Sequence, residues 1–278
     1  MGAEPTELLE FDLERRFSGV GRLYGQAGAQ RIFKAHVLVV GIGGVGSWVV
    51  EALARSGVGR LTLVDMDHIA ESNINRQIHA LSQTLGQSKC LAMKNRVLDI
   101  HPECEVQIID DFVQVDNWLD MVKSIVTPLD FLIDACDQIK AKSTLAAWCL
   151  KQQVEMVCIG AAGGKKRADL MQMDDLLSVT HDPMLAKLRY NLRKEGVLLR
   201  DQKKSTIQCV YSKEEILNPW AAQSDDPSAV NTGESITTSA NDLSCHGYGS
   251  SVAVTASFGF CAAGWALERL AQSKGPNL

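Results

Sequence analysis

An apolar strand, a glycine-rich turn, a helix and a second apolar strand follow one another within about thirty residues of this chain. Residues 36–40 (HVLVV) stop at Gly41, apolar residues recur at helical spacing over 48–56, and residues 60–65 (RLTLVD) form the next apolar run. A continuous β-branched run of this length is typical of a strand that is buried on both faces of a parallel sheet. The order therefore predicts a βαβ unit, and it limits the fold to those built from parallel strands and crossover helices.

The same alternation continues along the chain. Helical patterns occur at 87–99, 118–126 and 141–152, and strand patterns at 105–109, 129–134 and 154–159. We therefore predict an α/β fold, with a Rossmann-like, doubly wound, mostly parallel sheet over residues 36–160. Further on, the pattern predicts two strands around a long charged insert, then a flexible loop and an apolar helix, at 168–173, 206–211, 222–244 and 250–272.

The turn after the first strand carries the motif GxGxxG, with glycines at Gly41, Gly43, Gly44 and Gly46. In this motif the first glycine permits the tight turn, the second lets the backbone approach a phosphate, and the last allows close packing of helix and strand. The free N–H groups at the start of the helix then bind the anion. The motif predicts a nucleotide site but does not choose between NAD, FAD and ATP.

Charged residues beyond the motif favour a triphosphate. Asp65 ends the second strand, where a carboxylate binds ribose hydroxyls, and this fits any of these nucleotides. Residues 72–77 (SNINRQ) add Arg76, and Lys89 follows. A dinucleotide needs only its pyrophosphate neutralised, whereas two added cations suit the β- and γ-phosphates and the departing pyrophosphate. The alternative is that Arg76 and Lys89 are surface charges.

A carboxylate follows the strand at 129–134, in the segment DACD that ends at Asp137. The carboxyl ends of parallel strands line the ligand crevice, and Mg²⁺ takes oxygen ligands that it shares with nucleotide phosphates. Asp137 is therefore the candidate magnesium ligand. Asp134 is the alternative, and it would otherwise cap the following helix.

Together, GIGGVG, LTLVDMD, SNINRQ, GQSK and DACD resemble the nucleotide site of the ubiquitin-activating superfamily and its bacterial relatives, which adenylate sulfur-carrier proteins. The resemblance covers about residues 12–160. It implies that ATP and Mg²⁺ are the cofactors, that the four glycines form the phosphate loop and that Asp65 binds ribose. It also implies that Asn73, Arg76 and Lys89 contact the phosphates and that Asp137 supports Mg²⁺.

Three further segments, 16–25 (RFSGVGRLYG), 160–165 (GAAGGK) and 244–260 (SCHGYGSSVAVTASFGF), resemble the tRNA threonylcarbamoyladenosine dehydratase family. That resemblance implies one domain over 1–278, with a nucleotide-binding core at 36–160 and a substrate-binding C-terminal elaboration at 161–278. The implied substrate is tRNA carrying N6-threonylcarbamoyladenosine. ATP would activate its threonyl carboxylate, and the carbamoyl group would then close a ring and expel AMP. A homodimer is also implied.

The chain departs from the carrier activators in two ways. It has no CxxC pair, so we expect no zinc site, and Gly19 stands where their RxxRQ segment has its second arginine. Arg16 or Arg22 is the candidate for an arginine supplied to the partner subunit. Cys245, in the dehydratase-like segment, is a candidate for accepting an acyl group or a sulfur, which would make a sulfur-transfer protein a second partner. The alternative is a small residue in a turn.

Charge and cysteine usage limit the partners and the compartment. The net charge of −5 argues against nonspecific coating of nucleic acid, yet residues 187–204 hold seven basic and two acidic residues, and Lys165–Arg167 adds more. A charge run of this kind is more often a solvated face, but the resemblance to the dehydratase family favours a contact with the tRNA backbone. Eight scattered cysteines predict reduced thiols and a cytoplasmic protein. The apolar run at 252–267 is too short for a stable membrane span.

Three functions remain open from the sequence. The first is the tRNA dehydratase. The second is an adenylating activator of a ubiquitin-like sulfur-carrier protein. The third is an NAD-dependent oxidoreductase or a nucleotide-binding scaffold without catalysis.

Overall fold

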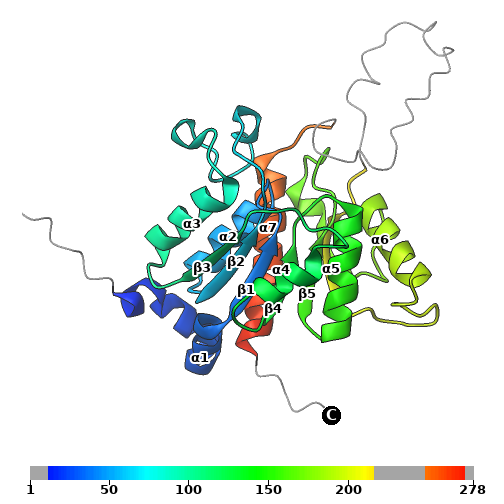
Figure 1. Ribbon diagram of the computed structural model, residues 1–278, viewed down its shortest axis with the longest axis horizontal. Helices are drawn as coiled ribbons and strands as arrows, with labels where there is room; N and C mark the ends of the chain where they lie inside the picture. The colour runs from blue at the N-terminus through cyan, green and yellow to red at the C-terminus, as the bar shows by residue number, and fades with distance from the viewer. Residues whose placement is uncertain (1–11, 216–247, 273–278) are drawn as a thin grey trace, which may run out of the picture.

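A computed structural model describes residues 12–215 and 248–272 of the chain. The apolar runs of the first half form parallel strands, and the segments between them form helices (Figure 1). In chain order these elements are α1 Leu13–Lys34, β1 His36–Val40, α2 Gly46–Arg55, β2 Arg60–Val64, α3 Lys89–Ile100, β3 Glu105–Ile109, α4 Trp118–Ser124, β4 Phe131–Asp134, α5 Ile139–Gln152 and β5 Glu155–Ile159. Each predicted strand and helix of residues 36–160 is present, with ends shifted by a few residues.

The second half adds the elements η3 Ala168–Leu170, β6 Met171–Asp175, α6 Pro183–Lys194, β7 Ile207–Ser212 and α7 Val252–Ala271. Two short 3₁₀ turns, η1 Glu71–Asn73 and η2 Ser82–Thr84, lie between β2 and α3. The strand predicted at 168–173 begins later, because residues 168–170 form a 3₁₀ turn. The charged insert contains α6, which the sequence reading did not predict. The loop predicted at 222–244 lies outside the described residues.

The seven strands form one sheet in the order β3-β2-β1-β4-β5-β7-β6, in which only β6 runs antiparallel to its neighbour. β1 lies beside both β2 and β4, so the strand order reverses there, which is where doubly wound sheets bind ligands. β7 pairs in parallel with β5 and extends the sheet beyond residue 160. The predicted doubly wound, mostly parallel fold is confirmed.

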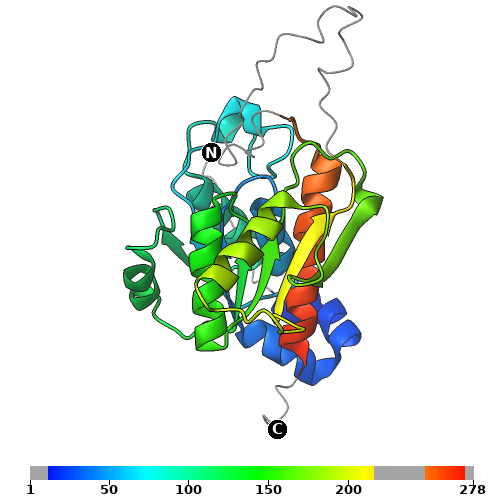
Figure 2. The same cartoon turned by 90° about the vertical axis from the view of Figure 1, so that its right-hand side faces the viewer.

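Helices cover both faces of the sheet (Figure 2). On one face α2, α3 and α7 bury a core that includes Val39, Leu63 and Phe258. On the other face α4, α5 and α6 bury a second core around Leu132 and Leu188. α7 packs along α2, and Gly259 makes that contact possible, because a Cβ there would lie 2.8 Å from the Trp48 Cβ. The apolar C-terminal segment is thus a buried helix of the core. No helix of the described residues is long and apolar enough to cross a bilayer.

Candidate nucleotide site

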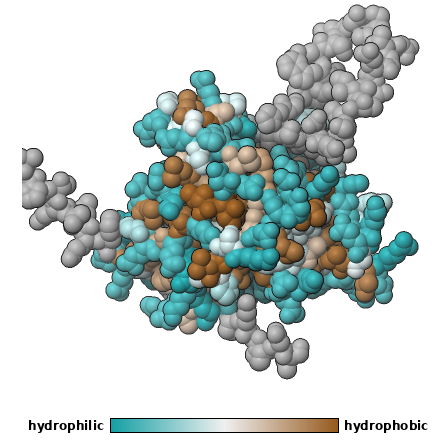
Figure 3. Space-filling model, viewed as in Figure 1, coloured by the Kyte–Doolittle hydropathy of each residue, from teal (hydrophilic) through white to brown (hydrophobic). Residues whose placement is uncertain are grey.

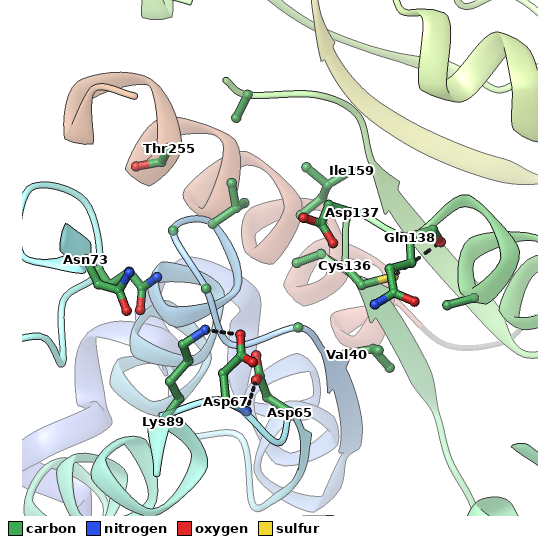
Figure 4. Close-up of a pocket in the computed structure, with 18 of the residues that line it drawn as sticks. Val40, Asp65, Asp67, Asn73, Lys89, Cys136, Asp137, Gln138, Ile159 and Thr255 are labelled. Carbon is green, nitrogen blue, oxygen red and sulfur yellow. Dashed lines mark hydrogen bonds and ion pairs between the residues drawn. The ribbon is translucent and has the colours of Figure 1, made fainter. Parts of the chain in front are cut away.

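A cavity of about 400 Å³ lies at the carboxyl ends of β1, β2, β4 and β5. The glycine loop forms its floor, and Figure 4 shows Asp65, Asp67 and Lys89 on one side of the cavity and Asp137 and Ile159 on the other. Loops from strands far apart in sequence therefore meet at the point where the strand order reverses. The sequence predicted this position for a ligand. Gly46 is buried at the start of α2, whereas most of the predicted residues line the cavity: Gly41, Gly43, Gly44, Asp65, Asn73, Arg76, Lys89 and Asp137.

Close backbone contacts require glycine at two positions of the loop, Gly41 and Gly46. Gly41 has φ +84°, and a Cβ there would lie 2.8 Å from the Cys136 nitrogen. A Cβ on Gly46 would lie 1.8 Å from the Gly41 carbonyl oxygen, so no other residue fits at the start of α2. A Cβ on Gly44 would meet the aliphatic stem of Arg76 at 3.3 Å. The loop therefore presents bare backbone to the cavity, as an anion site at a helix N-terminus requires.

Asp65 ties this loop to the end of β2. Its Oδ2 accepts a hydrogen bond from the Ile42 nitrogen at 2.7 Å, and its Oδ1 accepts one from the Asp67 nitrogen at 2.8 Å. Burial raises the pKa of the Asp65 carboxyl, although Lys89 and both backbone donors oppose that rise. Asp65 lines the cavity, and a carboxylate has further lone pairs for a ribose hydroxyl.

Lys89 is the first residue of α3, and its side chain is almost fully buried. Its Nζ lies 2.6 Å from Oδ2 of Asp67, whose side chain is about half exposed. The ammonium therefore stays at the cavity wall with a single carboxylate partner among the described residues, and it has further N–H donors for a phosphate.

Arg76 is held by its own turn. Its Nη1 donates to the Ser72 carbonyl at 2.6 Å and to the Asn75 Oδ1 at 2.9 Å, while the Trp48 indole donates to the Arg76 carbonyl at 2.9 Å. Buried Asn73 accepts from the Ala70 nitrogen at 3.1 Å and so closes the 3₁₀ turn η1. These contacts place the partly buried Arg76 side chain at the cavity wall, with its aliphatic stem over Gly44.

The two aspartates after β4 differ sharply. Asp134 is fully buried, and its carboxylate is engaged by protein groups, including the Lys142 ammonium at 3.2 Å. It does not cap α5, whose N-cap is Gln138. Asp137 is exposed and lines the cavity. Among residues 12–215 and 248–272 no three His, Cys, Asp or Glu side chains gather as a metal site. A lone carboxylate facing the cavity is compatible with Mg²⁺, which is usually bound by one or two carboxylates plus substrate phosphates.

Several cavity residues were not assigned from the sequence. Gln77 is 5% exposed with a buried Oε1 that has no partner in the described structure, and it lines the cavity near Gly43. Met184 of α6 and Thr255 of α7 complete the lining. Gln77 stands inside the SNINRQ segment and could have been inferred. The other two come from helices whose contact with the site depends on the tertiary fold.

Residues 160–163 also line the cavity, and Asp182 holds them in place. Its Oδ2 accepts a hydrogen bond from the Ala161 nitrogen at 2.9 Å, while its Oδ1 caps α6 through the Leu185 nitrogen at 2.9 Å. A Cβ on Gly160 would collide with the same carboxylate. The dehydratase-like GAAGGK segment is therefore part of this site.

Other candidate residues lie elsewhere. Arg16 donates to the carbonyls of Asp99 and Ile100, at the end of α3 and away from the cavity, and Arg22 is exposed on α1. Lys165 does not add to a basic surface, because it is 4% exposed and its Nζ donates to the Glu214 carbonyl. Cys245 lies outside the described residues.

The fold and site define a nucleotide-binding α/β protein whose phosphate loop faces two cations and a carboxylate. The ThiF family model matches residues 18–277, and the chain belongs to this family. The tRNA threonylcarbamoyladenosine dehydratase of Haemophilus influenzae is 42% identical over 94% of this chain and 95% of that protein. The Escherichia coli enzyme of the same name is 40% identical over 92% and 93%. A crystal structure of the E. coli enzyme in complex with ATP aligns with TM-score 0.80 and 37% identity, over 95% of this chain and 96% of that one.

Proposed function

We propose that this chain is an ATP-dependent tRNA threonylcarbamoyladenosine dehydratase that works through a carboxylate adenylate. The observation that carries the proposal is the meeting of Arg76, Lys89 and Asp137 around the glycine loop in one cavity. The relatives of that name span nearly the whole chain, and E. coli structures of that enzyme hold ATP and AMP. These nucleotides favour the adenylation reading over a nicotinamide site. The relatives favour a tRNA substrate over a carrier protein.

In the first step the threonyl carboxylate of N6-threonylcarbamoyladenosine attacks the α-phosphorus of ATP, and the bond to pyrophosphate breaks. The backbone N–H groups of Gly43 and Gly44, which line the cavity, hold the phosphates, and Asp65 accepts from the ribose. Gly41 and Gly46 give the loop its shape, and the Gly41 N–H donates to the Val64 carbonyl at 2.9 Å. Charge grows on the departing pyrophosphate, so Arg76 and Lys89 stabilise the transition state more than bound ATP. Asn73 supports this wall of the site by closing the turn that carries Arg76.

In the second step the carbamoyl group attacks the acyl carbon, loses a proton, and AMP leaves. Nucleophile and acyl group belong to one nucleoside, so ring closure is intramolecular and needs no enzyme thioester. We therefore give Cys245 no required part in cyclisation. A separate prediction is that Cys245 takes part in sulfur transfer with a partner protein. If Cys245→Ala leaves cyclisation unchanged, the thiol can serve only that second reaction.

Asp137 would hold Mg²⁺ on the phosphates, where the ion would neutralise the negative charge that Arg76 and Lys89 do not neutralise. The support is its position: Asp137 is exposed to the cavity, whereas Asp134 is committed to a buried ion pair.

The basic tract at residues 187–204 is a candidate tRNA-binding surface beside the site. Six of its seven basic side chains are exposed, and the exception is Arg189, which donates to the Leu176 and Val179 carbonyls. α6 begins at the cavity with Met184 and runs about 18 Å. β7 runs parallel to β5, so the residues before Ile207 lie at the opposite edge of the sheet. We propose that the tRNA backbone follows this path from the cavity to that edge, through Lys187, Arg193, Lys194, Arg200, Lys203 and Lys204.

The remaining predictions concern assembly and compartment. We infer one domain over 1–278, because β7 extends the sheet of the 36–160 core and α7 packs on α2. A homodimer needs an apolar contact surface, and Figure 3 shows hydrophobic side chains gathered near the middle of one face. In such a dimer Arg16 or Arg22 would have to reach the partner's cavity, since neither lies at its own. We place the activity in the cytoplasm, where its substrate tRNA resides. Sedimentation of the purified chain tests the dimer.

The deciding experiment is mass spectrometry of tRNA nucleosides after incubation with enzyme, ATP and Mg²⁺. We expect the threonylcarbamoyladenosine mass to fall by one water, with AMP and pyrophosphate as co-products. A carrier peptide ending in Gly-Gly should not stimulate ATP turnover. Unchanged nucleosides, together with carrier-stimulated turnover, would contradict the proposal and favour the carrier activator.

A further inference from the structure

A fully buried ion pair lies directly behind the cavity, between the carboxyl ends of β4 and β5. Lys142 of α5 and Asp134, the last residue of β4, are both 0% exposed, and their Nζ and Oδ2 atoms are 3.2 Å apart. The same Nζ donates to the carbonyl of Ile159, the last residue of β5, at 2.7 Å. One ammonium group therefore fastens together the ends of two neighbouring strands, and each strand leads straight into a segment that lines the cavity.

Asp134 also holds the loop after β4. Its Oδ1 accepts hydrogen bonds from the Cys136 nitrogen at 3.1 Å and from the Cys136 thiol at 3.0 Å. The Cys136 backbone in turn packs under the glycine loop, where Gly41 leaves no room for a Cβ. Asp137 is the next residue. Lys142 thus connects, through at most two hydrogen bonds, to the cavity segments 135–138 and 160–163.

Stability alone does not explain this pair. Burial lowers the pKa of the Lys142 ammonium, but the Asp134 carboxylate and the sulfurs of Cys158 and Cys136 together raise it by more, so the side chain stays charged although it is fully buried. Taking two charges out of water is costly, and buried ion pairs can often be replaced by apolar residues of similar size with no loss of stability. What an apolar pair cannot supply is a donor to the Ile159 carbonyl and an acceptor for Cys136.

We propose that Lys142 and Asp134 form a positioning pair that holds segments 135–138 and 160–163 in the geometry that adenylation requires. This role rests on the proposed function. The opposite wall, with Asp65 and Lys89, is carried by β2 and the start of α3 and does not depend on the pair. Loss of the pair should therefore slow the chemical step and leave most of the ATP affinity intact.

The test compares wild type with Lys142→Met and with Asp134→Asn combined with Lys142→Met. The single variant leaves a buried carboxylate without its partner and should melt at a lower temperature. The double variant removes both charges while the Asn oxygen still accepts from Cys136, so its melting temperature should return toward wild type. Its kcat should nevertheless stay at least about tenfold lower, with the Kd for ATP within about threefold, because small displacements at a reacting centre cost rate rather than binding.

The control variant removes a different pair, with Glu51→Gln and Arg96→Met between α2 and α3, where the carboxylate is buried and the two side chains lie 2.5 Å apart. It should keep the wild-type kcat. Wild-type kcat in the double variant of Asp134 and Lys142, whatever its stability, would overturn the positioning role. If that variant does not fold, Lys142→Leu combined with Asp134→Asn carries the same expected loss of kcat, because it also removes the donor to the Ile159 carbonyl.

Hydrogen–deuterium exchange gives a readout that needs no turnover. Amide exchange over 135–138 and 160–163 should rise in the double variant, while the loop at 41–46 keeps more of its protection. Unchanged exchange in both segments would overturn the positioning role. If wild type turns over no tRNA, the proposed function fails, and exchange still decides the role of the pair.

Discussion

Replacing Gly46 with alanine is the sharpest test of the phosphate loop. The new Cβ would lie 1.8 Å from the Gly41 carbonyl oxygen, whereas an ordinary contact begins at 3.4 Å, so that carbonyl must move by about 1.6 Å. A displacement of this size next to the reacting phosphate should lower kcat by at least about 100-fold. Forcing a methyl group into a closely packed turn should also cost about 1–3 kcal/mol of unfolding free energy.

The matched control is Gly264→Ala in α7, where glycine is exposed and a Cβ meets nothing within 4 Å. The same methyl group should there raise the unfolding free energy by about 0.5–1 kcal/mol and leave turnover unchanged. Denaturant unfolding and nucleoside mass spectrometry measure both variants. Wild-type turnover in Gly46→Ala would refute the argument that this contact shapes the loop.

Three further substitutions test the Arg76 cation, the proposed metal ligand and the charge network around Glu51. Arg76→Ala should lower ATP–pyrophosphate exchange by about 10²–10³, and a normal rate would remove Arg76 from the transition state. Asp137→Asn should raise the Mg²⁺ concentration for half-maximal rate at least about tenfold, and an unchanged Mg²⁺ profile would show the assignment to be wrong. For Glu51, burial raises the pKa, but the hydrogen bonds and charges of Arg96 and Arg55 together lower it by more, so the folded pKa lies below the unfolded one. Its stabilisation is therefore present above the unfolded pKa and lost as pH falls through the folded one. Glu51→Gln should cost about 2 kcal/mol at neutral pH and little in acid, as urea unfolding at each pH would show.

The first half of the fold was predictable because its signals are local. Residues 36–40 and 60–64 are apolar runs that are typical of strands in a sheet covered on both faces. The glycine turn between them marks where β1 ends and where α2 begins. The cavity followed from the same signals, since the carboxyl ends of parallel strands meet at one edge.

α6 was missed although its sequence carries helix signals. Asp182 caps it, Pro183 stands at its first turn, and Met184, Leu185, Leu188 and Leu192 are its buried side chains. Because basic residues occupy the outer face of α6, the segment was predicted to be a charged insert, and no helix was predicted there. A charge run and an amphipathic helix are compatible, because the charges need only one face.

The Asp134 alternative could not be settled from sequence, because its partners are distant. Lys142 is eight residues away on the next helix, and the Ile159 carbonyl belongs to another strand. Only the packing of α5 onto β4 and β5 brings these groups together. Local spacing could suggest a helix cap but not a buried ion pair.

The two acidic strand ends follow one pattern, which explains how carboxylates at the same edge take different roles. Asp65 accepts from the backbone nitrogen two residues on, and Asp134 does the same. In both turns the following carboxylate, Asp67 or Asp137, is the more exposed one and lines the cavity. The strand-end aspartate must first satisfy buried backbone donors, since an unpaired N–H there would cost more than a ligand contact gains. The later aspartate does not have to satisfy those donors, so in each turn its carboxylate is available to groups in the cavity. Asp67 there pairs with Lys89, and Asp137 is the proposed Mg²⁺ ligand, whereas the cation that Asp134 meets is the buried Lys142 behind the cavity.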